Sequence, residues 1–463
     1  MIAVLLAVLI LSVAFVEFPV SSLGTRDTES TQSNTGIIIP MFSPNYSQVQ
    51  VNEIIQAKQA NPQVPFVVIV DIADGPGNSY DSQRGDGIKS MQNAGITVLG
   101  YVPTVWGERG IPMIEKEILN FHNWYNVNGI YLDQMANWEF NSYGTYLASY
   151  YTDLTRYVHS LGMQKVLGNS GADVPYYFVG TVDQIGIFEN AYTPTLPYLA
   201  GWHLSYNKSN FWFVSYNVSN PNPYYIAAAS DYVNYLYLTN GVHPYPYDSL
   251  PPYFNTLISD LASLIPITIN SKSPDGSIID SGFLVTVTQP DGTANTLFTP
   301  ATFNVVKGST VTISAQNHAG FVFDHWSNGS TNGTITVTAE QAMSLVAYSK
   351  TSERTTALVV VHTSATTGTP VTGLWITAAL TNGSVAAAGY TPFSFEAYKG
   401  RSYKISVGNY ANVSFAYWGN SSQPPGQSSI NVTPTNNVYL QAYVNDNASR
   451  NASFNPGNYP LFS

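Results

Sequence analysis

Eight short apolar runs, each followed by a stretch of helical character, recur between residues 36 and 240. The runs are continuous in Val, Ile, Leu and aromatic residues, which is typical of strands buried on both faces. Eight such strands alternating with helices predict a closed (β/α)8 barrel, and a doubly wound parallel sheet is the alternative fold. The runs are Gly36–Pro40, Phe66–Asp71, Ile96–Val102, Val127–Asp133, Lys165–Asn169, Gln184–Asn190, Phe211–Asn217 and Tyr235–Asn240.

Four of the intervening segments show clear helical spacing of apolar residues. In one of them, Phe254, Leu257, Leu261 and Leu264 recur every three or four positions, as on one face of a helix. The predicted helices cover Gln50–Ala60, Met113–Tyr125, Tyr143–Leu161 and Ser249–Ile265.

After Pro266 the helical spacing stops, and Thr, Val, Gly and Ser dominate. Two segments then match at a constant offset of 92 residues: Lys307-Gly308 with Lys399-Gly400, and Trp326 with Trp418. Duplicated units of about 90 residues with short β runs predict two immunoglobulin-like sandwiches. Each Trp is expected to anchor the core of its own unit.

The expected domain order follows from these changes in composition and apolar spacing along the chain. An apolar run at Ile2–Val16, followed by small residues, indicates a signal peptide or anchor over residues 1–24 and therefore an extracellular or cell-surface protein. Eleven Asn-x-Ser/Thr sequons agree with export as a glycoprotein, and eight of them lie after residue 320, where they would coat a stalk. The predicted units are a linker at 25–35, the barrel at 36–266, sandwiches at 270–351 and 355–445, and a flexible tail at 446–463.

Composition narrows the function classes. Charged residues make up 10% of the chain, the net charge is −11, and no basic patch is visible, so nucleic acid is not an expected partner. The seven His show no zinc-site spacing, and the chain has no Cys, so we expect no metal and no cofactor. The 33 Tyr and 8 Trp suit a protein that handles neutral polymers, since sugar rings pack on aromatic faces.

Functional residues of a (β/α)8 barrel lie at the carboxyl ends of its strands. Asp133 and Glu189 end the fourth and sixth runs in a chain that is poor in charge, so we expect both carboxyls to face one polar cavity. Two such acids are the minimum equipment for glycoside hydrolysis, in which one protonates the leaving oxygen and the other stabilises or attacks the anomeric carbon. The alternative is that each acid caps the helix that follows it.

Other residues at these strand ends are expected to bind substrate. Gln134 and Asn169 are candidates to orient sugar hydroxyls, and Arg109 is a candidate to bind a carboxylate, unless it pairs with Glu108 or Glu115 at the surface. The remaining candidates are polar or aromatic residues at the same ends: Asp71, Tyr101, Trp106, Asn190, Tyr216 and Tyr237. Asp71 has the alternative role of capping the turn Asp74-Gly75-Pro76-Gly77.

Several of these stretches, in order, resemble the spherulin-4 family (spherulation-specific family 4). The matching segments, which span about residues 36–265, are Gly36–Pro40, Asp74–Gly77, Gly95–Thr104, Trp124–Asp133, Gly168–Gly171, Phe188-Glu189 and Tyr247–Tyr253. The resemblance implies a glycoside-hydrolase barrel, since fungal members act on galactosamine-containing polysaccharide. It implies that Asp133 and Glu189 are catalytic. Family members typically carry an acidic pair where this chain has Asp133-Gln134, and often Asn where it has Asp71.

The leading hypothesis is therefore a secreted or surface glycoside hydrolase that acts on an amino-sugar polymer, with Glu189 as general acid and Asp133 as base or nucleophile. In a substrate-assisted route, Asp133 would instead orient the substrate acetamide. The rival hypothesis is a non-catalytic barrel that binds glycans or builds a cell coat, which Gln134 favours because an amide cannot ionise. A third hypothesis is an adhesin whose barrel contacts other proteins.

Overall fold

The computed structural model describes residues 35–42, 47–273, 283–317, 322–350, 356–367, 371–409, 413–419 and 423–446. The predicted signal segment, nearly all of the linker and most of the tail lie outside the described residues. Five of the eleven sequons do so too: Asn45, Asn412, Asn420, Asn447 and Asn451.

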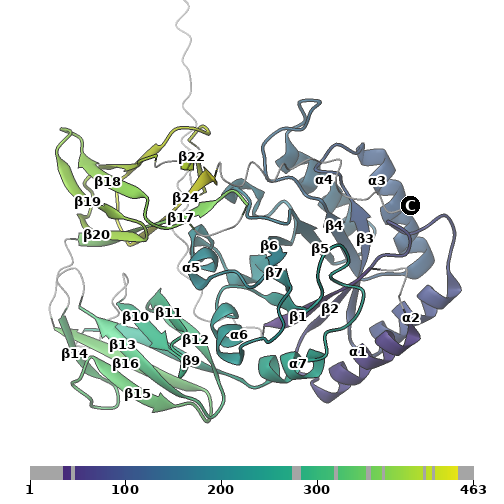
Figure 1. Cartoon of the computed structure of the whole chain (residues 1–463), viewed down its shortest axis with the longest axis horizontal. Helices are drawn as coiled ribbons and strands as arrows, with labels where there is room; N and C mark the ends of the chain where they lie inside the picture. Colours follow the sequence, from purple (N-terminus) through teal and green to yellow (C-terminus); the bar gives the residue numbers. More distant parts are fainter. Residues whose placement is uncertain are drawn as a thin grey trace, which may run out of the picture.

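Eight parallel strands close into a barrel in chain order, which confirms the predicted fold class (Figure 1). Each strand pairs with the next, and β1 closes the ring against β8. Every predicted run is a strand, with ends that differ by two residues at most. The strands are β1 (Gly36–Met41), β2 (Phe66–Val70), β3 (Thr97–Pro103), β4 (Gly129–Asp133), β5 (Lys165–Asn169), β6 (Gln184–Ala191), β7 (Phe211–Tyr216) and β8 (Tyr235–Leu238).

Helices surround the barrel (Figure 1). They are α1 (Gln48–Ala60), α2 (Ser82–Asn93), α3 (Ile111–Asn120), η1 (Phe121–Tyr125), α4 (Leu147–Ser160), η2 (Tyr176–Phe178), α5 (Leu196–Leu199), η3 (Trp202–Ser205), η4 (Lys208–Asn210), α6 (Pro223–Ala229) and α7 (Phe254–Ala262). The prediction of a helix up to Ile265 is wrong. That residue belongs to β9 (Leu264–Lys272), whose backbone pairs with β12 and β16, so the sandwich begins directly after α7. Helices α2 and α6 were not predicted. Helix α2 has few apolar residues at helical spacing, and α6 is short and ends in a run of three alanines.

The remaining strands form two domains of two four-stranded sheets each, as the sequence duplication predicted (Figure 1). The first domain has the sheets β11-β10-β13-β15 and β12-β9-β16-β14, and the second has the matching orders β19-β18-β21-β23 and β20-β17-β24-β22. Trp326 and Trp418 are buried in their respective domains, which confirms their role as core anchors. The strands are β10 (Leu284–Thr288), β11 (Ala294–Phe298), β12 (Ala301–Val306), β13 (Thr310–Gln316), β14 (Val322–Trp326), β15 (Thr334–Thr338), β16 (Met343–Lys350), β17 (Thr356–Ala365), β18 (Trp375–Leu380), β19 (Val385–Tyr390), β20 (Phe393–Tyr398), β21 (Tyr403–Val407), β22 (Val413–Trp418), β23 (Ser429–Val432) and β24 (Val438–Asp446).

The first sandwich is bonded to the barrel through one buried acid, Asp231, which follows α6. Its two carboxylate oxygens accept hydrogen bonds from the Asn304 backbone N–H at 2.7 Å and the Asn295 side-chain amide at 2.6 Å. Asn295 also donates to the Ala228 carbonyl at 2.8 Å. A buried carboxylate with these partners fixes the sandwich against the barrel, because separating the two domains would leave buried polar groups without hydrogen-bond partners.

The second sandwich also packs on the barrel. Trp202 of η3 donates its indole N–H to the Tyr443 hydroxyl at 2.9 Å and to Asp173 at 3.3 Å. The Tyr176 backbone N–H donates to the Gly419 carbonyl at 3.1 Å. Both sandwiches are therefore hydrogen-bonded to the barrel, and the expectation that they form a stalk stays a prediction.

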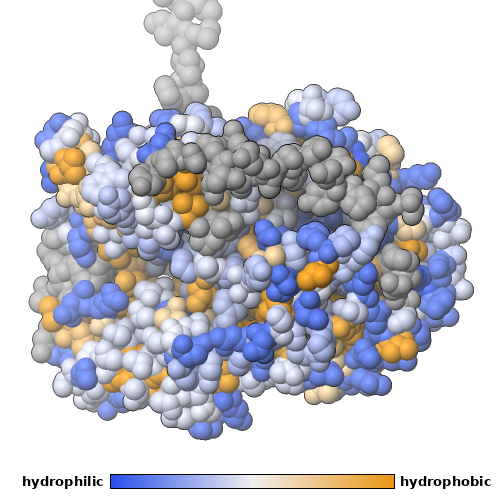
Figure 2. Space-filling model, viewed as in Figure 1, coloured by the Kyte–Doolittle hydropathy of each residue, from blue (hydrophilic) through white to orange (hydrophobic). Residues whose placement is uncertain are grey.

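The surface in the same view is mostly hydrophilic, with hydrophobic residues in small separate areas (Figure 2). Within the described ranges, none of the helices has the length and apolar character needed to cross a membrane.

We predict that Asp231→Ala lowers the free energy of unfolding by about 2–4 kcal/mol, because it leaves two sandwich donors buried without an acceptor. A urea titration followed by fluorescence measures the change. Asp153→Ala is the control, since it removes an exposed ion pair with Arg156 that is worth at most about 0.5 kcal/mol. Equal midpoints for the two variants would contradict the role of Asp231.

Candidate active site

The carboxyl ends of β4 and β6 carry the two predicted acids, and a β-bulge decides where Glu189 points. Gly186 pairs with Trp212 of β7, and Glu189 pairs with Val214, so three positions on β6 span two on β7. Paired residues share a face of a sheet, so the extra residue brings Glu189 to the face of Gly186, whereas strict alternation would turn it to the opposite face. The bulge therefore allows Glu189 to face Asp133.

One amide joins the two acids. The Asn169 side-chain Nδ2, at the end of β5, donates to Asp133 Oδ1 at 3.0 Å and also to Glu189 Oε2. Asn169 is held by the Gly171 backbone N–H, which donates to its Oδ1 at 3.0 Å. The three predicted residues therefore meet at one point, and the expectation that both carboxyls face one position agrees with this geometry.

Two tyrosines complete the hydrogen bonding of the acids. The Tyr101 hydroxyl donates to Asp133 Oδ2 at 2.8 Å, and the Tyr247 hydroxyl donates to Glu189 Oε1 at 2.7 Å. Tyr101 was predicted as a site residue, although as a substrate-binding group. Tyr247 was missed, although it begins the segment Tyr247–Tyr253 that the family resemblance had singled out. Both carboxylates thus share the amide donor, Glu189 has the tyrosine donor Tyr247, and Asp133 has Tyr101 together with a hydrogen bond to the Tyr131 side chain.

Burial raises the pKa of both acids, and repulsion from Asp133 adds to the rise at Glu189. Burial raises the pKa of Glu189 to about 7, the charge of Asp133 adds to the rise, and the hydrogen bonds from Tyr247 and Asn169 oppose it. Burial also raises the pKa of Asp133, while donors from Tyr101, Asn169 and the backbone of Gln134 oppose that shift. Glu189 can therefore hold a proton near neutral pH, and the additional donors around Asp133 favour its charged form.

Asp71, which directly follows β2, lies close enough to Asp133 to be affected by its charge. Burial raises its pKa to about 6, and the charges of Asp74 and Asp133 contribute to the rise. Its Oδ1 also accepts the Gly75 backbone N–H at 3.0 Å. Asp71 therefore holds the glycine-rich turn, as the alternative role required, and adds negative charge near the pair.

Strained backbone gathers at this mouth. Among the described residues, non-glycine residues with positive φ are Asp74, Val105, Trp106, Asn126, Gln134, Tyr192 and Asn217, and all but Asn126 follow a barrel strand at its carboxyl end. Left-handed backbone is unfavourable for a β-branched residue such as Val105, and such strain often accompanies functional sites. The Trp106 N–H donates to the Gln134 carbonyl at 2.7 Å, which ties the β3 loop to the residue after Asp133.

The remaining predicted residues divide into two groups. Asn190 and Tyr216 lie half-buried at the mouth, where the Tyr216 hydroxyl donates to Asn190 Oδ1 at 3.3 Å. Gln134 and Trp106 also lie there, half-buried, with their backbones bonded to each other. These four are placed where substrate contact is feasible.

Two residues that were predicted to bind substrate, Arg109 and Tyr237, do not lie where they could contact it. Arg109 donates to the Pro103 carbonyl and forms a salt bridge with Glu117 of α3, so it ties the β3 loop to its helix and pairs with neither Glu108 nor Glu115. Tyr237 is wholly buried in the barrel core. Both predictions are therefore corrected, because each side chain is already used within the fold.

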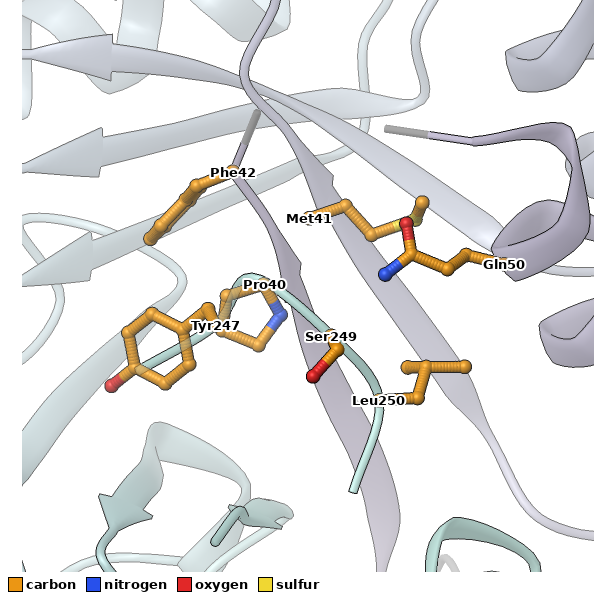
Figure 3. Close-up of a pocket in the computed structure, with 7 residues that line it drawn as sticks. All are labelled: Pro40, Met41, Phe42, Gln50, Tyr247, Ser249 and Leu250. Atoms are coloured by element: carbon orange, nitrogen blue, oxygen red, sulfur yellow. The ribbon is translucent and has the colours of Figure 1, made fainter. Parts of the chain in front are cut away.

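A small pocket lies beside the ring of Tyr247, the residue whose hydroxyl donates to Glu189 (Figure 3). Its lining comprises Pro40, Met41, Phe42, Gln50, Tyr247, Ser249 and Leu250. The Phe42 and Tyr247 rings meet edge to face at 5.6 Å, and the Gln50 amide donates to the Asp248 carbonyl at 3.2 Å. These contacts hold the Tyr247 ring so that its hydroxyl reaches Glu189. Across the described ranges, no cluster of three or more His, Cys, Asp or Glu is arranged to hold a metal ion.

Residues 36–261 match the sequence profile of spherulation-specific family 4, Spherulin4. The barrel belongs to this family. The match spans the eight strands and the helices α1 to α6, together with most of α7, and confirms the resemblance drawn from the sequence motifs. No curated protein sequence matches the chain.

Solved structures share parts of this architecture. Sph3 from Aspergillus clavatus, in complex with GalNAc, has a TM-score of 0.44 and 18% identity, over 50% of this chain and 98% of that chain. A mutant O-GlcNAc hydrolase from Thermobaculum terrenum has a TM-score of 0.34 and 13% identity, over 49% and 58%. The shaft pilin spaA from Lactobacillus rhamnosus GG has a TM-score of 0.17 and 10% identity, over 39% and 97%. These likenesses assign no activity to this chain.

The raised pKa of Glu189 predicts a pH-dependent cost to stability. The folded-state pKa of about 7 lies above the ordinary value of 4.5, so the cost begins as pH rises through 4.5 and is complete above 7. Glu189→Gln removes it, so the unfolding temperature of this variant should exceed that of the wild type by more at pH 8 than at pH 5. Thermal unfolding at both pH values tests this, and a difference that does not change with pH would contradict it.

Proposed function

We propose that the barrel hydrolyses glycosidic bonds of an amino-sugar polysaccharide of the galactosamine type, with Glu189 as the general acid and Asp133 as the nucleophile. The observation that carries the proposal is the single Asn169 amide bonded to both carboxylates. Two acids held together at a barrel mouth, one with a pKa near neutral, are what glycoside hydrolysis requires.

The separation of the acids favours retention of configuration. Two hydrogen bonds to one nitrogen keep their nearest oxygens within about 6 Å of each other. Retaining enzymes hold their carboxyls ~5–5.5 Å apart, and inverting enzymes leave ~6.5–9.5 Å for a water molecule. The geometry therefore supports a double displacement over a single attack by water.

In the first step, Glu189 gives its proton to the glycosidic oxygen while an Asp133 oxygen attacks the anomeric carbon. The carbon–oxygen bond to the leaving sugar breaks, and a glycosyl ester forms on Asp133. In the second step, the Glu189 carboxylate takes a proton from water, and the water oxygen displaces Asp133 from the anomeric carbon. Tyr101 and Asn169 stabilise the charge of Asp133 before attack and after release.

The substrate class and location rest on other grounds. The family resemblance supplies the galactosamine polymer, and Asp71 adds an acid near Asp133 that suits a substrate bearing an amino group. A polymer of this kind lies outside the cytoplasm, which is consistent with the expected signal peptide and with an extracellular or surface location.

Hydrolysis of acetylated and deacetylated galactosamine and glucosamine polymers tests the activity. We expect reducing ends from at least one galactosamine polymer, and a fall in kcat of at least about 100-fold in both Glu189→Gln and Asp133→Asn. Asp153→Asn, an exposed acid of α4, is the control and should retain wild-type activity. Cleavage of acetylated polymer alone would show that Asp133 orients the acetamide and that the acetamide is the nucleophile. Equal activity in all variants would refute the assignment.

Tyr247→Phe tests the link between hydrogen bonding and proton transfer. The hydroxyl donates to charged Glu189 and so lowers its pKa; without it the pKa rises further. The alkaline limb of the kcat/KM profile, near pH 7 in the wild type, should move to higher pH. A lower kcat/KM with an unmoved limb would assign Tyr247 to packing alone.

Glycan binding without hydrolysis is the second candidate function, and Gln134 favours it. Family members typically carry an ionisable acid there, and an amide cannot transfer a proton. In this chain the Gln134 backbone supports Asp133 and accepts from Trp106, roles that do not depend on its side chain. Polymer binding with no product under any of the assay conditions would decide for this function.

A further inference from the structure

Exposed aromatic side chains of the barrel gather at the mouth that holds the acids. Among the described barrel residues, the exposed aromatic side chains are Tyr80, Trp138, Phe140, Tyr143, Tyr146, Tyr192 and Tyr245. All seven lie in loops that follow β2, β4, β6 or β8 at the carboxyl ends of the strands. Exposed aromatic rings are costly in water, and their restriction to one end points to a binding surface.

Four of the seven lie in residues 138–146, which we call the aromatic hairpin. This segment begins five residues after Asp133, and Phe140 and Tyr146 form a β-bridge across its turn. Their rings lie 5.6 Å apart, and the Tyr146 ring lies 6.4 Å from that of Tyr177, in the segment after Asn169. The segments that follow β4 and β5 thus contribute rings to one continuous aromatic group, which is Phe140, Tyr146 and Tyr177.

The aromatic hairpin is anchored to the neighbouring loop. The Asn141 side-chain amide donates to the Gly107 carbonyl at 2.8 Å, and the Ser142 backbone N–H donates to Glu108 at 2.7 Å. Asn141 Oδ1 also accepts the backbone N–H groups of Tyr143 and Thr145, at 3.0 and 2.8 Å. The backbone of the aromatic hairpin is therefore held in place before anything binds, which reduces the entropy lost on binding.

We propose that the aromatic hairpin binds the part of a polysaccharide strand that extends beyond the cleaved bond. This inference rests on the proposed function, and it adds that the strand leaves the site over the loops after β4 and β5. The rings would stack on sugar faces, and Trp138 and Tyr143 provide two such surfaces, with 41% and 79% of each residue exposed. The hairpin carries one charged residue, Glu139, which suits an occupant dominated by hydroxyl groups.

The test is a double variant with a matched control. Trp138→Ala with Tyr143→Ala removes two exposed rings, and Trp375→Ala with Tyr390→Ala removes the same residue types, 45% and 65% exposed, from the second sandwich. Both pairs are made in the full chain with Glu189→Gln, so that substrate is not consumed, and binding to the galactosamine polymers is measured by affinity electrophoresis. The hairpin variant should bind at least about tenfold more weakly than the parent, and the sandwich variant should bind like the parent.

Turnover supplies the second measurement. With Glu189 intact, the hairpin variant should lose kcat/KM on the polymer at least about tenfold but keep that on an aryl galactosaminide, which is too short to reach the hairpin. Unchanged polymer binding in the hairpin variant would overturn the inference and would leave a protein partner as the occupant of the hairpin. Equal loss of binding in both double variants would also overturn it. If the wild type binds polymer but cleaves nothing, the proposed hydrolysis fails while the binding comparison still decides the role of the hairpin.

Discussion

Two carboxylates brought together in a half-buried site repel each other. The site therefore depends on the hydrogen-bond donors that stabilise both carboxylates. The Asn169 amide donates to both, and Tyr101 and Tyr247 each donate to one. These neutral donors offset part of the desolvation without cancelling the charge, as a cationic partner would. Glu189 therefore keeps a pKa near 7, so it can hold a proton for the leaving oxygen near neutral pH.

The rest of the barrel serves this arrangement. The parallel strands bring Asp133, Asn169 and Glu189 to one mouth, and the bulge in β6 turns Glu189 toward the other two. Val105 and Gln134, which have strained backbone, follow the neighbouring strands β3 and β4. The hydrogen bond from the Trp106 N–H to the Gln134 carbonyl joins their loops next to Asp133. Buried hydrogen bonds from Asp231 and Trp202 join the two sandwiches to the barrel.

The fold was predictable because buried parallel strands are continuous apolar runs, and the sandwiches because a constant offset reveals duplication. The acids were predictable from their position at strand ends. The bulge in β6 and the contact of Tyr247 were not, because the first depends on pairing with β7 and the second joins residues 58 positions apart. Arg109 was misassigned because the sequence does not show that its partner, Glu117, lies on the next helix within reach.

Carbon-13 NMR of the chain labelled at the Glu side-chain carboxyl carbon measures the central claim, which is that Asp133 and Glu189 share one electrostatic environment. A Glu signal should titrate near pH 7 and be missing from Glu189→Gln. In Asp133→Asn the same signal should titrate at lower pH, because the charge that helps to raise the pKa of Glu189 is gone. A Glu189 signal that titrates near 4.5 in the wild type, or one that Asp133→Asn does not move, would contradict the account.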